Sequence, residues 1–296
     1  MLLNLKKWPE SHVIWFAELV VHAIVVDDYI SPVEMDYLSR IVCAIESDEE
    51  KDRLFKMVES KEKRPLAAPP GLSSELKGII FTELAALMIA DLDFDKSEQV
   101  FMVELAQTFG FSRPYTEKLM AWCMQGYTWK RVQMNLLGIQ NARDYESVPF
   151  VPLDEFNADQ RLWYAEVCIN TIIVDGKITP DELALIRTTL GFIENNVQKD
   201  TLLHYLKNRL HPKLQAPHGI SEKTLQIVYF EVITHFVLQY QGGEKDRLFT
   251  RNLARVCQFQ NELILKADKW WQMGLSWRRY SLILIKNVEL VAEPVT

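Results

Sequence analysis

Pairs of acidic residues recur in this sequence at one spacing, and carboxylates placed in this way could bind a cation. In three loops between predicted helices an aspartate is followed seven residues later by a glutamate: Asp27 and Glu34, Asp91 and Glu98, and Asp175 and Glu182. Ligation by oxygen alone suits Ca²⁺, Mg²⁺ or Mn²⁺. If the first two pairs pack against each other, four carboxylates converge, and the pattern then predicts a divalent-cation site.

The second acidic loop adds two further carboxylates, Asp93 and Asp95. Alternating aspartates also begin an EF-hand calcium loop, but the rest of that pattern is missing. Lys96 stands where the sharp turn needs glycine, and Met102 stands where a bidentate glutamate belongs. A fourth loop of this kind begins with Gln239 instead of an aspartate. We therefore expect the second half of the chain to bind a cation less well than the first.

A purely structural role explains the same residues, because each glutamate falls in the first turn of a predicted helix. In the stretch from Ser31 to Glu34, the Ser31 hydroxyl can accept a helix N–H while the glutamate accepts the N–H of Ser31. The stretch from Thr179 to Glu182 repeats this capping box. The sequence leaves both readings open: capping alone, or capping combined with a weak cation site.

The loops must be positioned by helices, and the chain repeats one helical unit with an offset of 148 residues. Residues 15–18 (Trp-Phe-Ala-Glu) match residues 163–166 (Trp-Tyr-Ala-Glu). Further along, Trp122, Gly126, Trp129 and Arg131 match Trp270, Gly274, Trp277 and Arg279. One offset that survives from end to end over such unusual residues indicates a tandem duplication.

Apolar periodicity predicts the helices of the first copy. They are expected at about residues 10–26, 48–62, 75–91, 95–109, 113–125 and 129–140, and adding 148 gives the second copy. Helices that follow the acidic loops should begin near Ser31, Asp95, Thr179 and Gly243. Because glycine is sparse and no segment has strand periodicity, we expect an all-α fold without a sheet.

The duplication predicts two tandem helical domains, 1–142 and 157–296, joined by a linker at 143–156. The first 148 residues carry 23 acidic and 16 basic side chains, whereas the remaining residues carry 17 of each. The formal net charge of −7 argues against a nucleic-acid partner, whose phosphates require a basic surface. No apolar run approaches the roughly 20 residues of a membrane span, so a cytoplasmic protein is expected.

Aromatic and basic residues near the end of the second copy form a candidate protein-binding surface. The residues concerned are Trp270, Trp271, Trp277, Arg278 and Arg279. Tryptophan and arginine are favoured where proteins bind each other. The alternative is that the tryptophan rings fill the core of each copy.

The acidic loops also carry a resemblance to a known family. An apolar helix, an Asp-Gly-x-Ile-Thr-Pro-x-Glu loop and a leucine-rich helix resemble the TerB-like family of tellurite-resistance proteins. The best matches are residues 174–182 and 90–98, while Asp28 replaces the usual glycine of the first loop. The resemblance implies an all-α fold, acidic metal sites and no catalysis. It also implies stress-associated or accessory roles, often beside membrane complexes or co-chaperones.

The sequence therefore favours a non-enzymatic scaffold or accessory protein that binds protein partners, with a divalent cation in the first copy. No glycine-rich phosphate loop or nucleophile elbow is present. One alternative is a metal-dependent enzyme or metal-ion sensor that uses Asp27, Glu34, Asp91 and Glu98. Another is a structural subunit of a larger assembly.

Overall fold

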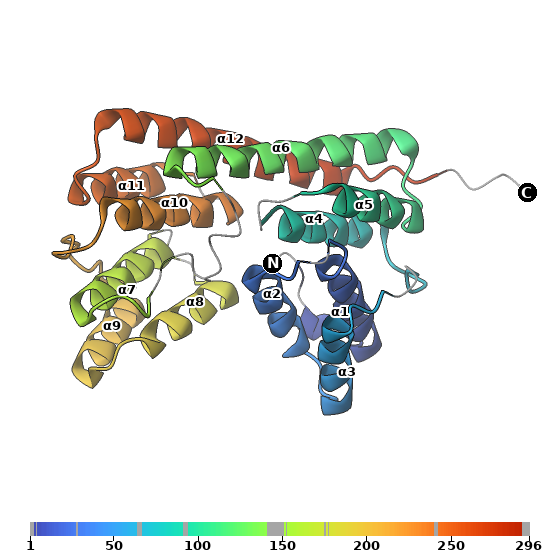
Figure 1. Ribbon diagram of the computed structural model, residues 1–296, viewed down its shortest axis with the longest axis horizontal. Helices are drawn as coiled ribbons and strands as arrows, with labels where there is room; N and C mark the ends of the chain where they lie inside the picture. Colours follow the sequence, from blue (N-terminus) through green and yellow to red (C-terminus); the bar gives the residue numbers. More distant parts are fainter. Residues whose placement is uncertain are drawn as a thin grey trace, which may run out of the picture. The chain divides into compact units, whose positions relative to one another are not determined.

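The computed structural model is built from α-helices joined by loops (Figure 1). It describes residues 3, 5–27, 29–63, 67–90, 94–140, 151, 153–174, 176, 178–239 and 242–291. Within these residues there are twelve α-helices, one short 3₁₀ helix at Leu5–Lys7 and no β-strand. The predicted all-α class is confirmed. No helix in the described part of the chain is long and apolar enough to cross a membrane.

Each helix of the first half has a counterpart in the second half. The first six are α1 (Glu10–Ile24), α2 (Pro32–Val42), α3 (Asp48–Glu59), α4 (Ser74–Ala90), α5 (Lys96–Thr108) and α6 (Arg113–Leu137). The last six are α7 (Ala158–Ile173), α8 (Pro180–Gly191), α9 (Asn196–Asn208), α10 (Glu222–Leu238), α11 (Glu244–Val256) and α12 (Asn261–Lys286). Every helix of the second set begins 148 residues after its counterpart. The helix starts thus follow the offset in the sequence, while superposition of the two copies stays a prediction.

The predicted helix starts after the acidic loops are confirmed, and local hydrogen bonds explain them. The residues that cap α2, α5, α8 and α11 are Ser31, Asp95, Thr179 and Gly243. The side chains of the first three accept the N–H of the residue three positions later, at 3.2, 2.9 and 3.3 Å. Such caps satisfy helix N–H groups that have no partner inside the helix.

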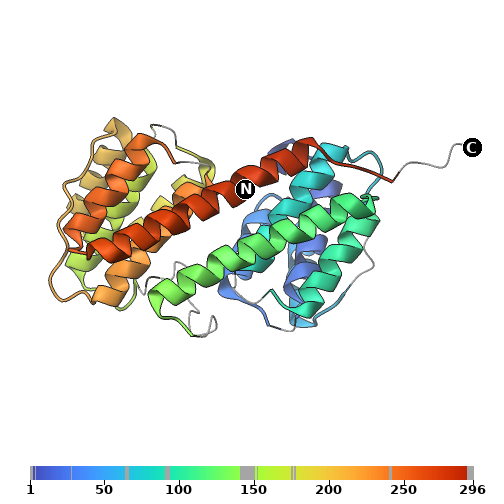
Figure 2. The same ribbon diagram turned by 90° about the horizontal axis from the view of Figure 1, so that it is seen from above.

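The last helix of each copy differs from the prediction. A break was expected between residues 125 and 129, but α6 runs without interruption through Gly126, and α12 is likewise continuous (Figure 2). Tyr115, Trp122 and Trp129 are buried along one face of α6, and Gly126 is buried with them. Glycine costs a helix about 1 kcal/mol relative to alanine. Burial of this apolar face outweighs that cost.

The chain divides into two compact units. Unit 1 consists of residues 1–134, 139–148 and 279–296, and unit 2 consists of residues 135–138 and 149–278. In unit 1, α1 packs against α2, α3 and α4, and α4 packs against α5; in unit 2, α7 packs against α8, α9 and α10. These units differ from the contiguous domains 1–142 and 157–296 expected from the sequence. The described end of the chain, residues 279–291, belongs to unit 1.

Candidate functional site

The glutamates of the predicted cation site are buried at the starts of their helices. Glu34, Glu98 and Glu182 are each exposed by 2% or less. One carboxylate oxygen of each accepts the backbone N–H of the capping residue, at 2.9, 2.8 and 2.6 Å. Asp246 of α11 is buried in the same position and accepts the N–H of Gly243 at 2.8 Å. Capping of the helix starts therefore accounts for one oxygen of each carboxylate.

Of the five aspartates of the predicted site, Asp27 and Asp95 lie in the described part of the chain. Asp27 accepts the N–H of Tyr29 at 3.1 Å, which closes a local turn after α1. Asp95 is the capping residue of α5. Burial raises its pKa, but hydrogen bonds from Glu98 and Ser97 together have the larger effect, so the pKa lies below its ordinary value. Asp91, Asp93 and Asp175, which the sequence analysis also assigned to the cation site, lie outside the described residues.

In unit 2 the second oxygen of Glu182 also has a partner. His235 of α10 lies 3.1 Å from Glu182 Oε1, across the contact between α8 and α10. Burial raises the pKa of Glu182, but hydrogen bonds from His235 and Thr179 outweigh it and hold the pKa below its ordinary value. A cation at this position would have to displace the imidazole. Copy 1 has Leu87 where copy 2 has His235, so this pair is particular to the second copy.

The described residues contain no group of three or more His, Cys, Asp or Glu side chains arranged to hold a metal ion. Because three of the aspartates lie outside that part of the chain, the Ca²⁺, Mg²⁺ or Mn²⁺ site stays a prediction. Within the described part, the acidic residues Glu34, Glu98 and Glu182 serve as helix caps.

The aromatic residues proposed for partner binding are buried inside unit 2. Trp270, Trp271 and Trp277 are all buried. The Trp271 ring stacks on Phe236 at 5.9 Å between centroids, and Trp270 meets Phe230 edge-on at 5.1 Å. The three rings therefore fill the core of unit 2, as in the alternative given above. They do not form the exposed aromatic patch that was expected for partner binding.

The two arginines beside these tryptophans differ from each other. Arg278 is buried, and its Nε donates to the backbone carbonyl of Leu238 at 3.4 Å. Arg279 is exposed. Of the five residues that the sequence analysis assigned to a protein-binding surface, Arg279 alone is exposed.

An extended segment packs on a surface of unit 1 that the sequence did not predict; this surface, called the groove below, is formed by Gly78, Gly110, Ser112, Tyr115 and Lys118. After α12 ends, residues 287–291 run across the turn between α5 and α6. The N–H of Ser112 donates to the carbonyl of Glu289, and the N–H of Val291 donates to the carbonyl of Gly110, both at 2.8 Å. These bonds pair Phe111 with Leu290 as in an antiparallel sheet. The groove thus binds the backbone of an extended chain.

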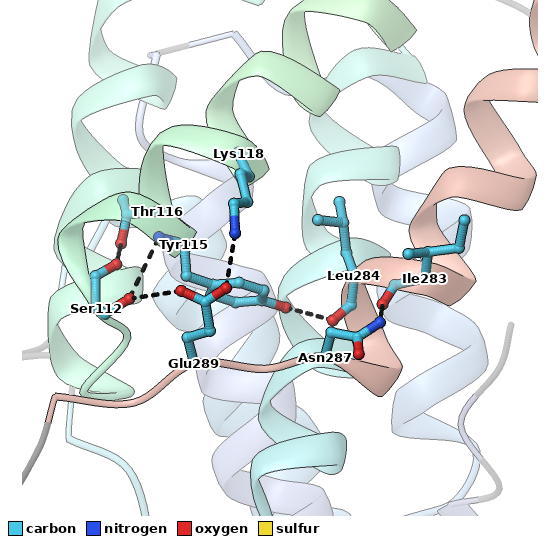
Figure 3. Close-up of polar contacts among 8 residues, drawn as sticks. All are labelled: Ser112, Tyr115, Thr116, Lys118, Ile283, Leu284, Asn287 and Glu289. Atoms are coloured by element: carbon cyan, nitrogen blue, oxygen red, sulfur yellow. Dashed lines mark hydrogen bonds and ion pairs between the residues drawn. The ribbon is translucent and has the colours of Figure 1, made fainter.

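Side chains add an electrostatic contact to the backbone pairing (Figure 3). The Glu289 carboxylate lies 2.6 Å from the Lys118 ammonium and 3.5 Å from the Ser112 hydroxyl. Beneath it, the Tyr115 hydroxyl donates to the carbonyl of Leu284 at 2.9 Å. Burial, together with the nearby Glu289 charge, raises the pKa of Tyr115 above its ordinary value, which favours the protonated, donating form.

The wall of this groove is shaped by a glycine. A Cβ added to Gly78 of α4 would lie 3.0 Å from Val288 and 3.4 Å from the Cα of Ile285. An added Cβ would require Val288 to shift by a few tenths of an ångström, because real Cβ atoms seldom come so close. Gly78 therefore lets the extended segment lie directly against α4.

The residues that line this groove have counterparts in unit 2, and these line a pocket of about 280 Å³. The pocket residues are Asn135, Leu136, Glu222, Gln226, Gln260, Glu262, Leu263 and Lys266. At the offset of 148, Gln226, Gln260, Leu263 and Lys266 correspond to Gly78, Ser112, Tyr115 and Lys118. The equivalent surfaces thus hold a bound segment in unit 1 and form a pocket in unit 2, where Gln226 replaces Gly78.

The end of α6 differs from the end of α12 in its backbone conformation. Gly138 has a positive φ of 62°, and the N–H of Ile139 bonds to the carbonyl of Met134 at 2.9 Å, which ends the helix in a left-handed turn. Lys223 of α10 also donates to the last helical carbonyl, that of Leu137. The counterpart of Gly138 is Lys286, which does not adopt a positive φ.

Comparisons of the chain with protein-family models, with curated proteins and with solved structures give no match.

Proposed function

We propose that this protein is a non-enzymatic interaction module and that the groove of unit 2 binds an extended segment of a partner protein. The observation that carries the proposal is the equivalent groove in unit 1, where residues 287–291 are bound by backbone pairing and a charge pair. Adding an extended strand to an exposed backbone edge is a recurrent mode of peptide recognition.

The backbone of unit 2 offers the same two bonding groups as unit 1. The N–H of Gln260 corresponds to that of Ser112, and the carbonyl of Gln258 corresponds to that of Gly110. No described residue accepts a hydrogen bond from the first or donates one to the second. An incoming segment would satisfy both groups, and the backbone bonds give affinity with little demand on sequence.

The charge of the lining determines which segments are favoured. In unit 1, Lys118 is the charged residue that faces the bound Glu289. In unit 2, Glu222 and Glu262 line the pocket together with Lys266, and Glu262 already pairs with that lysine at 2.7 Å. The remaining carboxylate favours a lysine or arginine side chain. We therefore propose a basic, extended partner segment.

A cytoplasmic location and membership of the TerB-like family are part of the proposal. The family rests on the loop sequences that begin with Asp91 and Asp175. The buried capping glutamates are compatible with the all-α fold that the resemblance implies.

Selection of random short peptides by the full chain tests the proposal. Displayed peptides should be enriched for lysine or arginine, and their affinities should be measured by fluorescence anisotropy. The double variant Glu222→Gln and Glu262→Gln should weaken binding about tenfold, since it removes the charges that attract the basic side chain. Gln260→Pro, which removes the proposed backbone donor, should weaken binding as well.

The matched control exchanges two exposed glutamates of unit 2 that do not line the pocket, Glu155→Gln and Glu244→Gln. This control should leave the affinity unchanged. Failure to enrich any peptide, or peptides that bind Gln260→Pro and the double variant as tightly as the native chain, would exclude the groove as the binding site.

A further inference from the structure

An exposed carboxylate of unit 1 accepts two backbone N–H groups at the start of α3. Glu10, the first residue of α1, accepts the backbone N–H groups of Glu46 and Ser47 through Oε1, at 2.8 and 3.2 Å. These N–H groups lie at the start of α3, where Ser47 is the capping residue. Unpaired N–H groups and the helix dipole make such a position attractive for a negative charge.

In unit 2 the same position has lost its carboxylate. The counterpart of Glu10 is Ala158, and the counterparts of the two donors are the N–H groups of Glu194 and Asn195. The alignment is anchored by Ile45 and Ile193, which are buried equally and directly precede these donors. No described residue accepts a hydrogen bond from either N–H.

A pocket of about 450 Å³ lies at this position. Its lining includes Ala158, Glu194 and Asn195, together with the apolar residues Phe156, Phe192 and Ile193. The polar residues of the lining are Asn157, Arg161, Glu194, Asn195 and Gln198, so the pocket combines a small apolar wall with several polar groups. The place filled by an internal carboxylate in unit 1 is therefore a cavity with two backbone donors in unit 2.

The net charge around the donors also differs between the copies. At the positions that line the pocket, copy 1 has three glutamates, Glu10, Glu46 and Glu50, and no basic residue. Copy 2 has one acidic residue, Glu194, and one basic residue, Arg161. The Arg161 guanidinium is held by the carbonyls of Leu153, Asp154 and Phe192, so its charge is fixed beside the pocket.

We propose that this pocket of unit 2 binds a small organic carboxylic acid. The carboxylate of the ligand would accept the N–H groups of Glu194 and Asn195, as Glu10 accepts their counterparts in unit 1. Arg161 would attract its charge, and the aromatic wall would contact its apolar body. The Glu194 side chain, 3.2 Å from Arg161, is 90% exposed and can turn towards solvent when the ligand enters. This site is separate from the peptide groove.

Benzoate is a suitable probe, and benzamide is its neutral control of the same shape. In NMR titrations of the full chain, benzoate should shift the amide resonances of Glu194 and Asn195, with an affinity about tenfold higher than that of benzamide because its bonds are charge-assisted. Equal binding of both compounds, or no shift of these two amides with benzoate, would overturn the proposal.

Variants test the counterpart argument directly. Ala158→Glu restores the carboxylate of unit 1, so it should shift the same two amides without ligand and abolish benzoate binding. Ala158→Ser leaves the pocket open and should retain binding within about twofold, as should Glu10→Ala in unit 1. Benzoate binding that survives Ala158→Glu would contradict the proposed site.

The carboxylate could also come from a glutamate side chain of another protein. A blocked dipeptide that contains glutamate tests this second source. Shifts at Glu194 and Asn195 that are stronger with this peptide than with benzoate would overturn the assignment to a free organic acid. Weaker shifts with the peptide are the expected result.

Discussion

The hydroxyl of Tyr115 donates a 2.9 Å hydrogen bond to the backbone carbonyl of Leu284, a residue 169 positions later in the chain. The bond is buried inside unit 1 and joins the beginning of α6 to the end of α12. It orients the helix end from which residues 287–291 enter the groove. The stability of unit 1 therefore depends on residues from both halves of the sequence.

Replacement of Tyr115 by phenylalanine should destabilise the protein by about 0.5–1.5 kcal/mol, because it removes one of the two donors to the buried Leu284 carbonyl and leaves the Asn287 N–H at 3.1 Å as the other. Chemical denaturation measures the free energy of unfolding, and hydrogen exchange at Ser112 and Val291 should accelerate as the segment loosens. Tyr205→Phe is a matched control without a described hydroxyl partner and should change the free energy by less than about 0.5 kcal/mol. An equal effect of both variants would show that the hydrogen bond contributes nothing specific.

Glu182 should make the stability of unit 2 dependent on pH in the acidic range. Its pKa in the folded protein lies below the ordinary value of 4.5, so its stabilising contribution is present above about pH 4.5 and is lost as the pH falls through the folded pKa. Glu182→Gln should cost about 1–3 kcal/mol at pH 7, as expected for hydrogen bonds to a charged group. The difference from the native chain should shrink below pH 4.5.

Denaturation curves from pH 3 to pH 7 check this expectation, with Glu155→Gln as the control at an exposed site. A penalty for Glu182→Gln that stays constant over this range would show that the charge of Glu182 is not responsible.

Glu10→Ala should destabilise unit 1 by about 1 kcal/mol, the usual cost of losing a side-chain cap. The carboxylate of Glu10 holds two N–H groups at the start of α3, and water replaces it only in part. Glu49→Ala, at an exposed position in the first turn of the same helix, should cost only a few tenths of a kcal/mol through the helix dipole. Thermal or chemical unfolding of both variants distinguishes capping from a general effect of charge.

The predicted cation site can be tested by thermal unfolding in the presence of Ca²⁺ or Mn²⁺. A cation that binds only the folded state should stabilise it, by about 2.7 kcal/mol at one hundred times the dissociation constant. Asp91→Asn should weaken this response, whereas Gln239→Ala should leave it unchanged. Calorimetry without binding heat, together with an unchanged unfolding temperature, would leave helix capping as the complete explanation of the acidic loops.

The sequence by itself determined the features that depend on residues close together in the chain. The starts of α2, α5 and α8 were predicted correctly because a capping box involves residues only three positions apart. The all-α class followed from apolar periodicity for the same reason. The common offset of the helix starts could likewise be predicted, since it is carried by matched residues such as Trp122 and Trp270.

Tertiary structure alone decided where distant segments meet. The sequence showed that Trp271 is large and apolar, but only packing against Phe236 decided that it is buried. Residues 287–291 contain no local signal for docking at Ser112, because backbone pairing over so long a separation depends on which surfaces the folded helices leave exposed. Likewise, the aligned copies show that Ala158 stands where copy 1 has Glu10, but they do not show which groups the Glu10 carboxylate contacts. Only the fold brings the Glu10 carboxylate to the N–H groups of Glu46 and Ser47, because a charge 36 residues away in sequence is placed there by the packing of α1 against α3.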